Sequence, residues 1–242
     1  SQKMSIMKYK SINFSKNTRN SKKIKFIIIH YTGMQSMRAS LYRLTSKRHK
    51  VSCHYLIDRK GTIFQLVEDN KIAWHAGKSK WKKFKNLNHN SIGIELVNKG
   101  HQFGYQKFSK KQINILIKLC LKLKRKYRIK NSFILGHSDV APLRKFDPGE
   151  KFPWFKFKKK NLGIWYSIKK NKSLLILGKK NLRNSFFKNL YKIGYRYFSK
   201  SRSSKTDKLV VKSFQRRFRQ NKVNGKIDLE CLKISDNLAL KS

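Results

Sequence analysis

Apolar residues follow two different spacings along the first part of the chain. Residues 22–33, 91–97 and 131–137 are short runs rich in β-branched side chains, which is typical of buried strands. Residues 53–67 contain two such runs on either side of a Lys-Gly dipeptide, and this arrangement predicts two strands joined by a turn.

The second spacing is helical. Residues 109–127 repeat apolar side chains every three or four positions, and Ser109 is a suitable N-cap for a helix that begins there. Because strands and helices are mixed along the chain, the pattern predicts an α/β domain with a central sheet and helices packed on it.

The pattern changes after residue 165. A basic connector with a few aromatic residues is expected over residues 156–180, followed by helices over 182–195 and 207–220 and a third helix within 224–239. We therefore predict a first domain, with an N-terminal extension, over residues 1–175 and a small three-helix bundle over residues 176–242.

The charge of the chain is strongly positive. Its 242 residues include 60 Lys and Arg but 11 Asp and Glu, so the formal net charge is +49. Such a charge can indicate a nucleic acid or an anionic surface as partner. The basic residues are spread through every segment, however, which favours a solvated surface over a localised binding stripe. The scarcity of acids makes each acidic residue informative.

Cysteine usage and the N-terminus exclude some classes of protein. Cys53, Cys120 and Cys231 are far apart and lack a C-x-x-C pairing, so neither a disulfide framework nor a thiolate zinc site is expected. No apolar run approaches the roughly 18 residues of a membrane span, and the first residues lack the apolar core of a signal peptide. A processed export signal or a lipid-bearing cysteine upstream of Ser1 stays compatible with the sequence.

Two histidines lie at the ends of predicted strands. His30 and His137 each end an apolar run and precede a loop, and such strand ends face the crevice where ligands bind in α/β sheets. Asp147, in the loop after His137, could complete a His₂Asp set that leaves the fourth position of a zinc ion open. Asp139 is interpreted as a turn-forming residue that orients this loop, or as a partner that supports the metal ligands. Of the other histidines, we expect His54 to be packed and His49, His89 and His101 to be solvated.

Five sequence blocks occur in an order that resembles a known family. The blocks FIIIHYT, VSCHYLID, GTIFQLVEDNKIAWHAGKSKW, LNHNSIGIELVNKG and LGHSDVAPLRKFDPG are similar to those of the zinc-dependent N-acetylmuramoyl-L-alanine amidases of type 2, which also resemble phage lysozymes of the T7 type and animal peptidoglycan recognition proteins. The resemblance implies a mixed central sheet flanked by helices. It also implies hydrolysis of the amide between N-acetylmuramic acid and L-alanine in peptidoglycan or its fragments.

The resemblance assigns roles to individual residues. It makes His30, His137 and Asp147 the ligands of one Zn²⁺, Glu95 the general base and Lys145 the stabiliser of the oxyanion. It also implies that His75 lines the substrate groove. Trp74, Asn88 and Trp81 are candidates for the same groove, or for the core.

The partner and location follow from this substrate. We expect a monomer that acts on peptidoglycan or muropeptides in the bacterial cell envelope, in the periplasm or at the outer membrane, with the cytoplasm left open because no signal peptide is visible. Residues 209–232 resemble a C-terminal peptidoglycan-binding module, which could anchor the enzyme on the wall. Its basic helix over residues 207–220 could instead contact an anionic envelope surface or merely pack on the catalytic domain. Deleting residues 176–242 should then spare cleavage of soluble fragments. Two alternatives to an amidase remain: a peptidoglycan-binding protein without catalysis, and a nucleic-acid-binding protein. If the protein is an amidase, no specific nucleic acid is expected as its partner.

Overall fold

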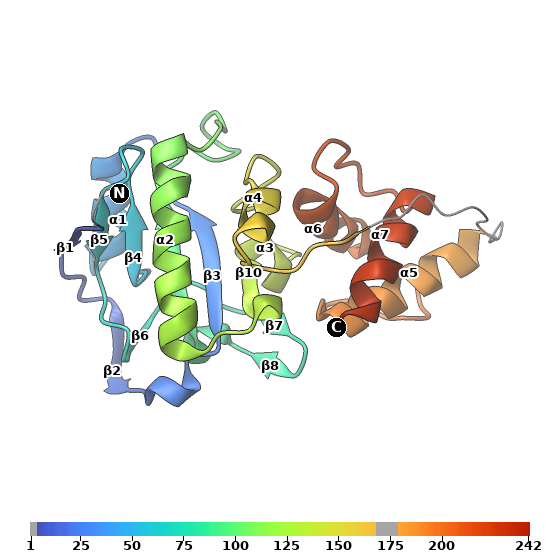
Figure 1. The fold of residues 1–242 in the computed structure, drawn as a ribbon, viewed down its shortest axis with the longest axis horizontal. Helices are drawn as coiled ribbons and strands as arrows, with labels where there is room; N and C mark the ends of the chain where they lie inside the picture. The colour runs from blue at the N-terminus through green and yellow to red at the C-terminus, as the bar shows by residue number, and fades with distance from the viewer. Residues whose placement is uncertain (1–3, 168–178) are drawn as a thin grey trace.

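A six-stranded sheet forms the centre of the first part of the chain, and the C-terminal helices lie to one side of it (Figure 1). The computed structural model describes residues 4–167 and 179–242. The strand order is β1-β5-β4-β9-β3-β10. Within this sheet, β4 and β5 pair antiparallel and the other neighbouring strands pair parallel, so the sheet is mixed, as predicted. The strands are β1 (Ile6–Lys8), β5 (Ile63–Gln65), β4 (Tyr55–Ile57), β9 (Ser91–Leu96), β3 (Phe26–Tyr31) and β10 (Ile134–Gly136).

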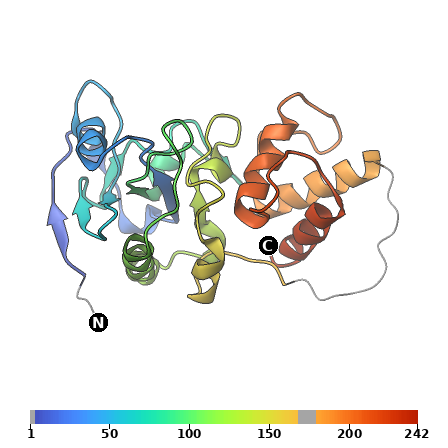
Figure 2. The same cartoon turned by 90° about the horizontal axis from the view of Figure 1, so that it is seen from above.

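Helices cover both faces of the sheet (Figure 2). Helix α2 (Lys110–Tyr127) begins at the predicted N-cap, where the Ser109 side chain accepts a hydrogen bond from the backbone N–H of Gln112. It lies on one face together with α4 (Trp154–Lys159), while α1 (Met37–Thr45) lies on the other. Helix α4 thus overlaps the start of the basic connector that the sequence predicted over residues 156–180.

Side-chain alternation along β3 and β9 decides which residues face the functional side of the sheet. Ile27 and Ile29 of β3 and Ile92 and Ile94 of β9 belong to the core that α2 covers. Because successive side chains of a strand point to opposite faces, His30 and Glu95 lie on the other face. The parallel register places these two residues opposite each other.

Several short elements carry no periodic signal and were not predicted. They are strand β2 (Phe14–Thr18), which pairs with β6 (Lys71–Ala73), and strand β7 (Lys80–Trp81), which pairs with β8 (Phe84–Lys85). The predicted N-terminal extension is in fact part of the fold, since β1 pairs with β5 in the central sheet.

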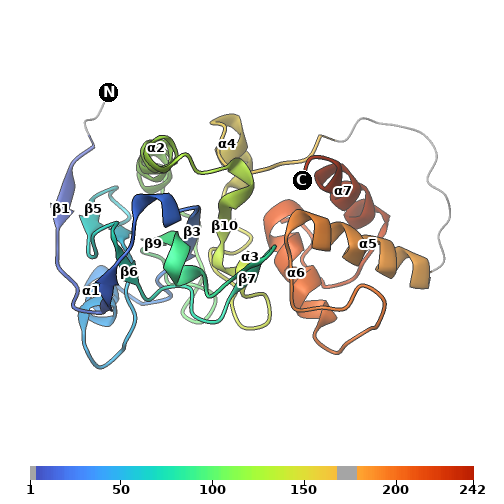
Figure 3. The same cartoon turned by 90° about the horizontal axis from the view of Figure 1, so that it is seen from below.

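The three predicted C-terminal helices are present as α5 (Lys179–Ile193), α6 (Asp207–Phe218) and α7 (Leu229–Leu240). We call residues 179–242 the helical domain. The domain boundary predicted near residue 175 lies outside the described residues. The helices pack beside β10 and the short helix α3 (His137–Val140) (Figure 3). One hydrophobic core spans both parts. Phe26 and Leu135 of the sheet share this core with Phe186 and Phe214 of the bundle.

Burial agrees with the interpretation of the composition. Cys53, Cys120 and Cys231 are buried and free. No lysine is buried among the residues whose side chains the structure describes, as expected for a solvated basic surface. Within the described ranges, no helix combines the length and the apolar character needed to cross a membrane.

Candidate active site

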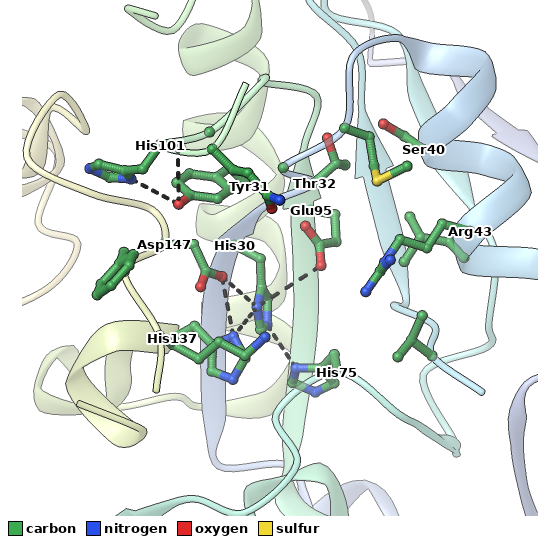
Figure 4. Close-up of a pocket in the computed structure, with 18 of the residues that line it drawn as sticks. His30, Tyr31, Thr32, Ser40, Arg43, His75, Glu95, His101, His137 and Asp147 are labelled. Atoms are coloured by element: carbon green, nitrogen blue, oxygen red, sulfur yellow. Dashed lines mark hydrogen bonds and ion pairs between the residues drawn. The ribbon is translucent and has the colours of Figure 1, made fainter. Parts of the chain in front are cut away.

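Three ligand-type side chains meet at one edge of the sheet (Figure 4). His30 comes from β3, His137 is the first residue of α3 directly after β10, and Asp147 lies in the following loop. His30 Nδ1 lies 3.0 Å from His137 Nδ1 and 3.0 Å from Asp147 Oδ2, and His137 Nδ1 lies 3.2 Å from the same oxygen. All three residues are buried. The predicted triad is thus brought together in space.

A chain of hydrogen bonds assigns the tautomer of His30. The Ser91 hydroxyl donates to the Leu87 carbonyl at 2.5 Å, so its oxygen accepts from His75 Nε2 at 2.9 Å. His75 Nδ1 is then an acceptor, and His30 Nε2 donates to it at 2.9 Å. The proton of His30 therefore lies on Nε2, and the lone pair of its Nδ1 faces His137 and Asp147.

The tautomer of His137 follows from a single contact. Its Nε2 lies 3.0 Å from the Ala76 carbonyl oxygen, which can only accept, so Nε2 carries a proton and, in the neutral ring, Nδ1 carries a lone pair. Burial, followed by the neighbouring His137, lowers the pKa of His30 to about 4. Although burial alone raises the pKa of Asp147, His137 and His30 lower it well below its usual range. A carboxylate thus faces two imidazole lone pairs.

This donor set fits a divalent cation. When both rings are neutral and no cation is bound, three electron-rich atoms at 3.0–3.2 Å from one another repel. Four ligands at about 2.0–2.1 Å from a tetrahedral zinc ion lie about 3.3 Å apart, which is close to the observed spacing. The three residues could therefore hold a metal ion.

Glu95 lies beside this cluster without belonging to it. Its Oε1 is 4.0 Å from His30 Nδ1, and its Oε2 has no hydrogen-bond partner among the described residues although the side chain is only 12% exposed. Burial and the nearby Asp147 raise the pKa of the Glu95 carboxyl well above its usual value. A buried carboxylate with an unused oxygen is unfavourable for stability, which favours a chemical role.

A cavity of about 760 Å³ opens over the cluster. Its lining includes Trp74, His75, Glu95 and Lys145. Lys145 is half-buried, and Trp74 forms part of the wall.

Two of the groove candidates lie elsewhere. Asn88 does not line the cavity; its Oδ1 accepts from the backbone N–H groups of His75 and Ala76 at 3.1 and 2.7 Å, so it shapes the loop that presents His75. Trp81 is a core residue, 1% exposed, whose ring packs against Tyr195.

The structure adds cavity residues that the sequence did not indicate. Tyr31 and Arg43 line it, and so does His101, which was expected to be merely solvated. His101 Nδ1 lies 2.8 Å from the Tyr31 hydroxyl and its Nε2 lies 2.9 Å from Glu150. These partners are 70 and 49 residues away along the chain, so no local pattern could have revealed them. The remaining histidines follow the expectation, since His54 is packed while His89 is exposed and His49 half-exposed.

Gly93 makes the position of His75 possible. A Cβ atom at Gly93 would lie 2.4 Å from the His75 ring, a distance that real contacts do not show. We expect Gly93→Ala to displace this ring, break its bond to His30 and weaken metal binding about 10- to 100-fold. Titration with zinc against a competing chelator measures this. As a control, the double variant Gly93→Ala, His75→Ala removes the clash and should recover thermal stability without recovering metal affinity; recovery of both would contradict the role of His75.

Known proteins share this architecture. Residues 20–150 match the family described as N-acetylmuramoyl-L-alanine amidase. The N-acetylmuramoyl-L-alanine amidase AmiD of Escherichia coli (strain K12) is 33% identical over 234 residues, which are 90% of this chain and 83% of AmiD. The 1,6-anhydro-N-acetylmuramyl-L-alanine amidase AmpD of Haemophilus influenzae is 38% identical over 110 residues, 45% of this chain and 57% of AmpD.

Solved structures agree with these matches. AmiD of E. coli, in complex with the substrate anhydro-N-acetylmuramic acid-L-Ala-D-gamma-Glu-L-Lys, superposes with a TM-score of 0.80 at 31% identity over 94% of this chain and 92% of AmiD. AMPDH3 of Pseudomonas aeruginosa, in complex with anhydromuramic pentapeptide, gives a TM-score of 0.79 at 27% identity over 95% and 96% of the two chains. The resemblance seen in the sequence blocks is confirmed, and the chain belongs to the N-acetylmuramoyl-L-alanine amidase family.

Proposed function

We propose that this chain is a zinc-dependent amidase that hydrolyses the amide bond between N-acetylmuramic acid and L-alanine. One observation carries the proposal. In a chain of this family, Glu95, whose Oε2 has no hydrogen-bond partner among the described residues, lies in register with His30 and lines the cavity together with His137 and Asp147. A metal site and a base with a raised pKa therefore face the same space.

Five side chains have separate roles in the proposed reaction. His30, His137 and Asp147 would hold one zinc ion, which supplies Lewis acidity and lowers the pKa of a bound water. Glu95 accepts the proton of the attacking water and later delivers it to the leaving amine, for which its raised pKa suits it. Lys145, in the cavity wall next to Asp147, stabilises the negative charge that develops on the amide oxygen.

The relatives support the choice of substrate class. Both AmiD and AMPDH3 bind anhydro-muropeptides in their solved structures, and their similarity covers the helical domain of this chain as well. We take soluble muropeptides or peptidoglycan as the substrate of this chain, the helical domain as a candidate contact for the wall polymer, and the cell envelope as its place of action.

A defined muramoyl-tripeptide tests the reaction. We expect mass spectrometry to show free tripeptide after incubation with the protein, no product after treatment with a chelator, and recovery of product when zinc is added back. Intact substrate in the presence of stoichiometrically bound zinc would overturn the proposal and favour a peptidoglycan-binding protein without catalysis.

A further inference from the structure

Asp139, two residues after the metal-ligand candidate His137, is held by the helical domain. It is 2% exposed, and its Oδ2 accepts from the Gly136 backbone N–H at 2.8 Å within its own segment. The other contacts cross to the helical domain: the Tyr195 hydroxyl donates to Oδ1 at 2.6 Å, and Arg217 Nη1 donates to Oδ2 at 2.7 Å. The sequence interpretation of Asp139 as a loop-orienting residue missed both partners, which are 56 and 78 residues away.

Arg217 belongs to α6 but is surrounded by the catalytic part of the chain. It is 2% exposed, its Nη2 donates to the Ile134 carbonyl of β10 at 3.0 Å, and its guanidinium lies 4.0 Å from the centre of the Trp154 ring. One side chain of the helical domain thus bonds to the strand before His137 and to the helix that His137 begins.

A second pair of residues holds the same helix. The Ser213 hydroxyl donates to the Ser138 carbonyl at 2.6 Å, and the Ser138 hydroxyl donates to Ser213 Oγ at 2.9 Å. On its other side, the Ser138 backbone N–H donates to the Asp147 carbonyl at 2.9 Å. The helix therefore connects the helical domain to two of the three metal-ligand candidates, His137 and Asp147.

We propose that Arg217 and Tyr195 of the helical domain are positioning residues for the metal centre, acting through Asp139 on His137. This inference rests on the proposed zinc site. Helix α3 has four residues, and a helix of one turn has no stability of its own, so its orientation depends on tertiary contacts. Metal ligands must be held in a fixed geometry, and loss of the groups that orient them typically lowers metal affinity 10- to 100-fold.

The bundle supplies a matched control at Arg219. This residue lies just beyond α6, is 3% exposed, and pairs with Asp228 and Glu230 inside the helical domain. Replacing Arg219 destabilises the bundle but removes no contact to α3. Replacing Arg217 destabilises the protein and also removes the contact to Asp139 of α3. A comparison of the two variants separates positioning from general destabilisation.

The experiment measures zinc affinity of the full chain by competition with a chromophoric chelator, together with the visible spectrum of the Co²⁺-substituted protein and the unfolding temperature. We expect Arg217→Ala to weaken zinc binding at least about tenfold and to alter the Co²⁺ spectrum, and Arg217→Lys to recover part of the affinity. Arg219→Ala should keep the affinity and the spectrum of the unchanged protein at a lower unfolding temperature.

Each other result has a defined meaning. If Arg217→Ala binds zinc as tightly as the unchanged protein, or if Arg219→Ala loses affinity to the same extent, the inference is wrong. If Arg217→Ala does not fold, Tyr195→Phe, which removes one hydroxyl, takes its place: a weaker but measurable loss of affinity supports the inference, and no loss overturns it. If the unchanged protein takes up no zinc, the proposed metal centre itself fails.

Discussion

Replacing Glu95 with glutamine is expected to lower kcat by about 100- to 10,000-fold, the usual contribution of a general acid or base. Glutamine keeps the size of the side chain but can neither accept nor return a proton at neutral pH. Zinc binding should persist, because Glu95 Oε1 lies 4.0 Å from His30 Nδ1 and outside the three-residue cluster. Stopped assays of muropeptide cleavage, run beside a zinc determination, measure both quantities.

A charge-matched control makes this result specific. Glu68→Gln removes an equal charge from an exposed carboxylate outside the cavity lining and should leave kcat unchanged. Wild-type kcat in Glu95→Gln would remove Glu95 from the mechanism. A loss of kcat accompanied by loss of zinc would instead make Glu95 a residue of the metal site.

The strands that carry the site could be predicted because their composition and burial agree. The run Ile27 to Ile29 is β-branched and fully buried, and it ends next to His30. Periodicity places His30 at a strand end, but it does not pair β3 with β9. The register between His30 and Glu95 arises from the tertiary fold, and the resemblance to a family, not the spacing, indicated that the two residues belong together.

The contacts that the sequence did not reveal join distant segments of the chain. His101 is placed by Tyr31 and Glu150, and Asp139 is placed by Tyr195 and Arg217, so none of these pairs lies within one element. The loop position of Asn88 has the same origin, since its side chain satisfies backbone N–H groups 12 and 13 residues away. Polar side chains in loops carry no period, and their function becomes visible only when their hydrogen-bond partners are known.

Of the alternatives for the C-terminal helices, the fold favours packing on the catalytic part of the chain over an independent module. The helices form the predicted bundle, but their apolar residues continue the core of the sheet instead of enclosing a separate one. Trp81 shows this continuity, because its ring packs against Tyr195 and approaches Gly194 so closely that a Cβ there would lie 2.3 Å from the ring. A domain joined in this way is part of the catalytic unit.

Deletion of residues 176–242 is therefore expected to prevent stable folding, rather than to leave an active catalytic domain. The deletion would expose Phe26, Ile28 and Leu135 to water and would leave the buried Asp139 without Arg217. Loss of one partner of a buried ion pair alone destabilises by about 3–5 kcal/mol, a large part of the roughly 5–15 kcal/mol that stabilises a typical domain. Soluble yield and thermal unfolding followed by circular dichroism measure the effect.

A second variant and one contrary outcome test whether the helical domain is part of the catalytic unit or a separable module. The truncated chain carrying Asp139→Asn no longer holds an unpaired carboxylate, so it should be more stable than the plain truncation while still exposing the apolar face of the sheet. A truncated chain that unfolds at the temperature of the full chain and cleaves muropeptides at the same rate would show a separable module. In that case the contacts of Asp139 with Tyr195 and Arg217 would join two independent domains without supporting the site between His30, His137 and Asp147.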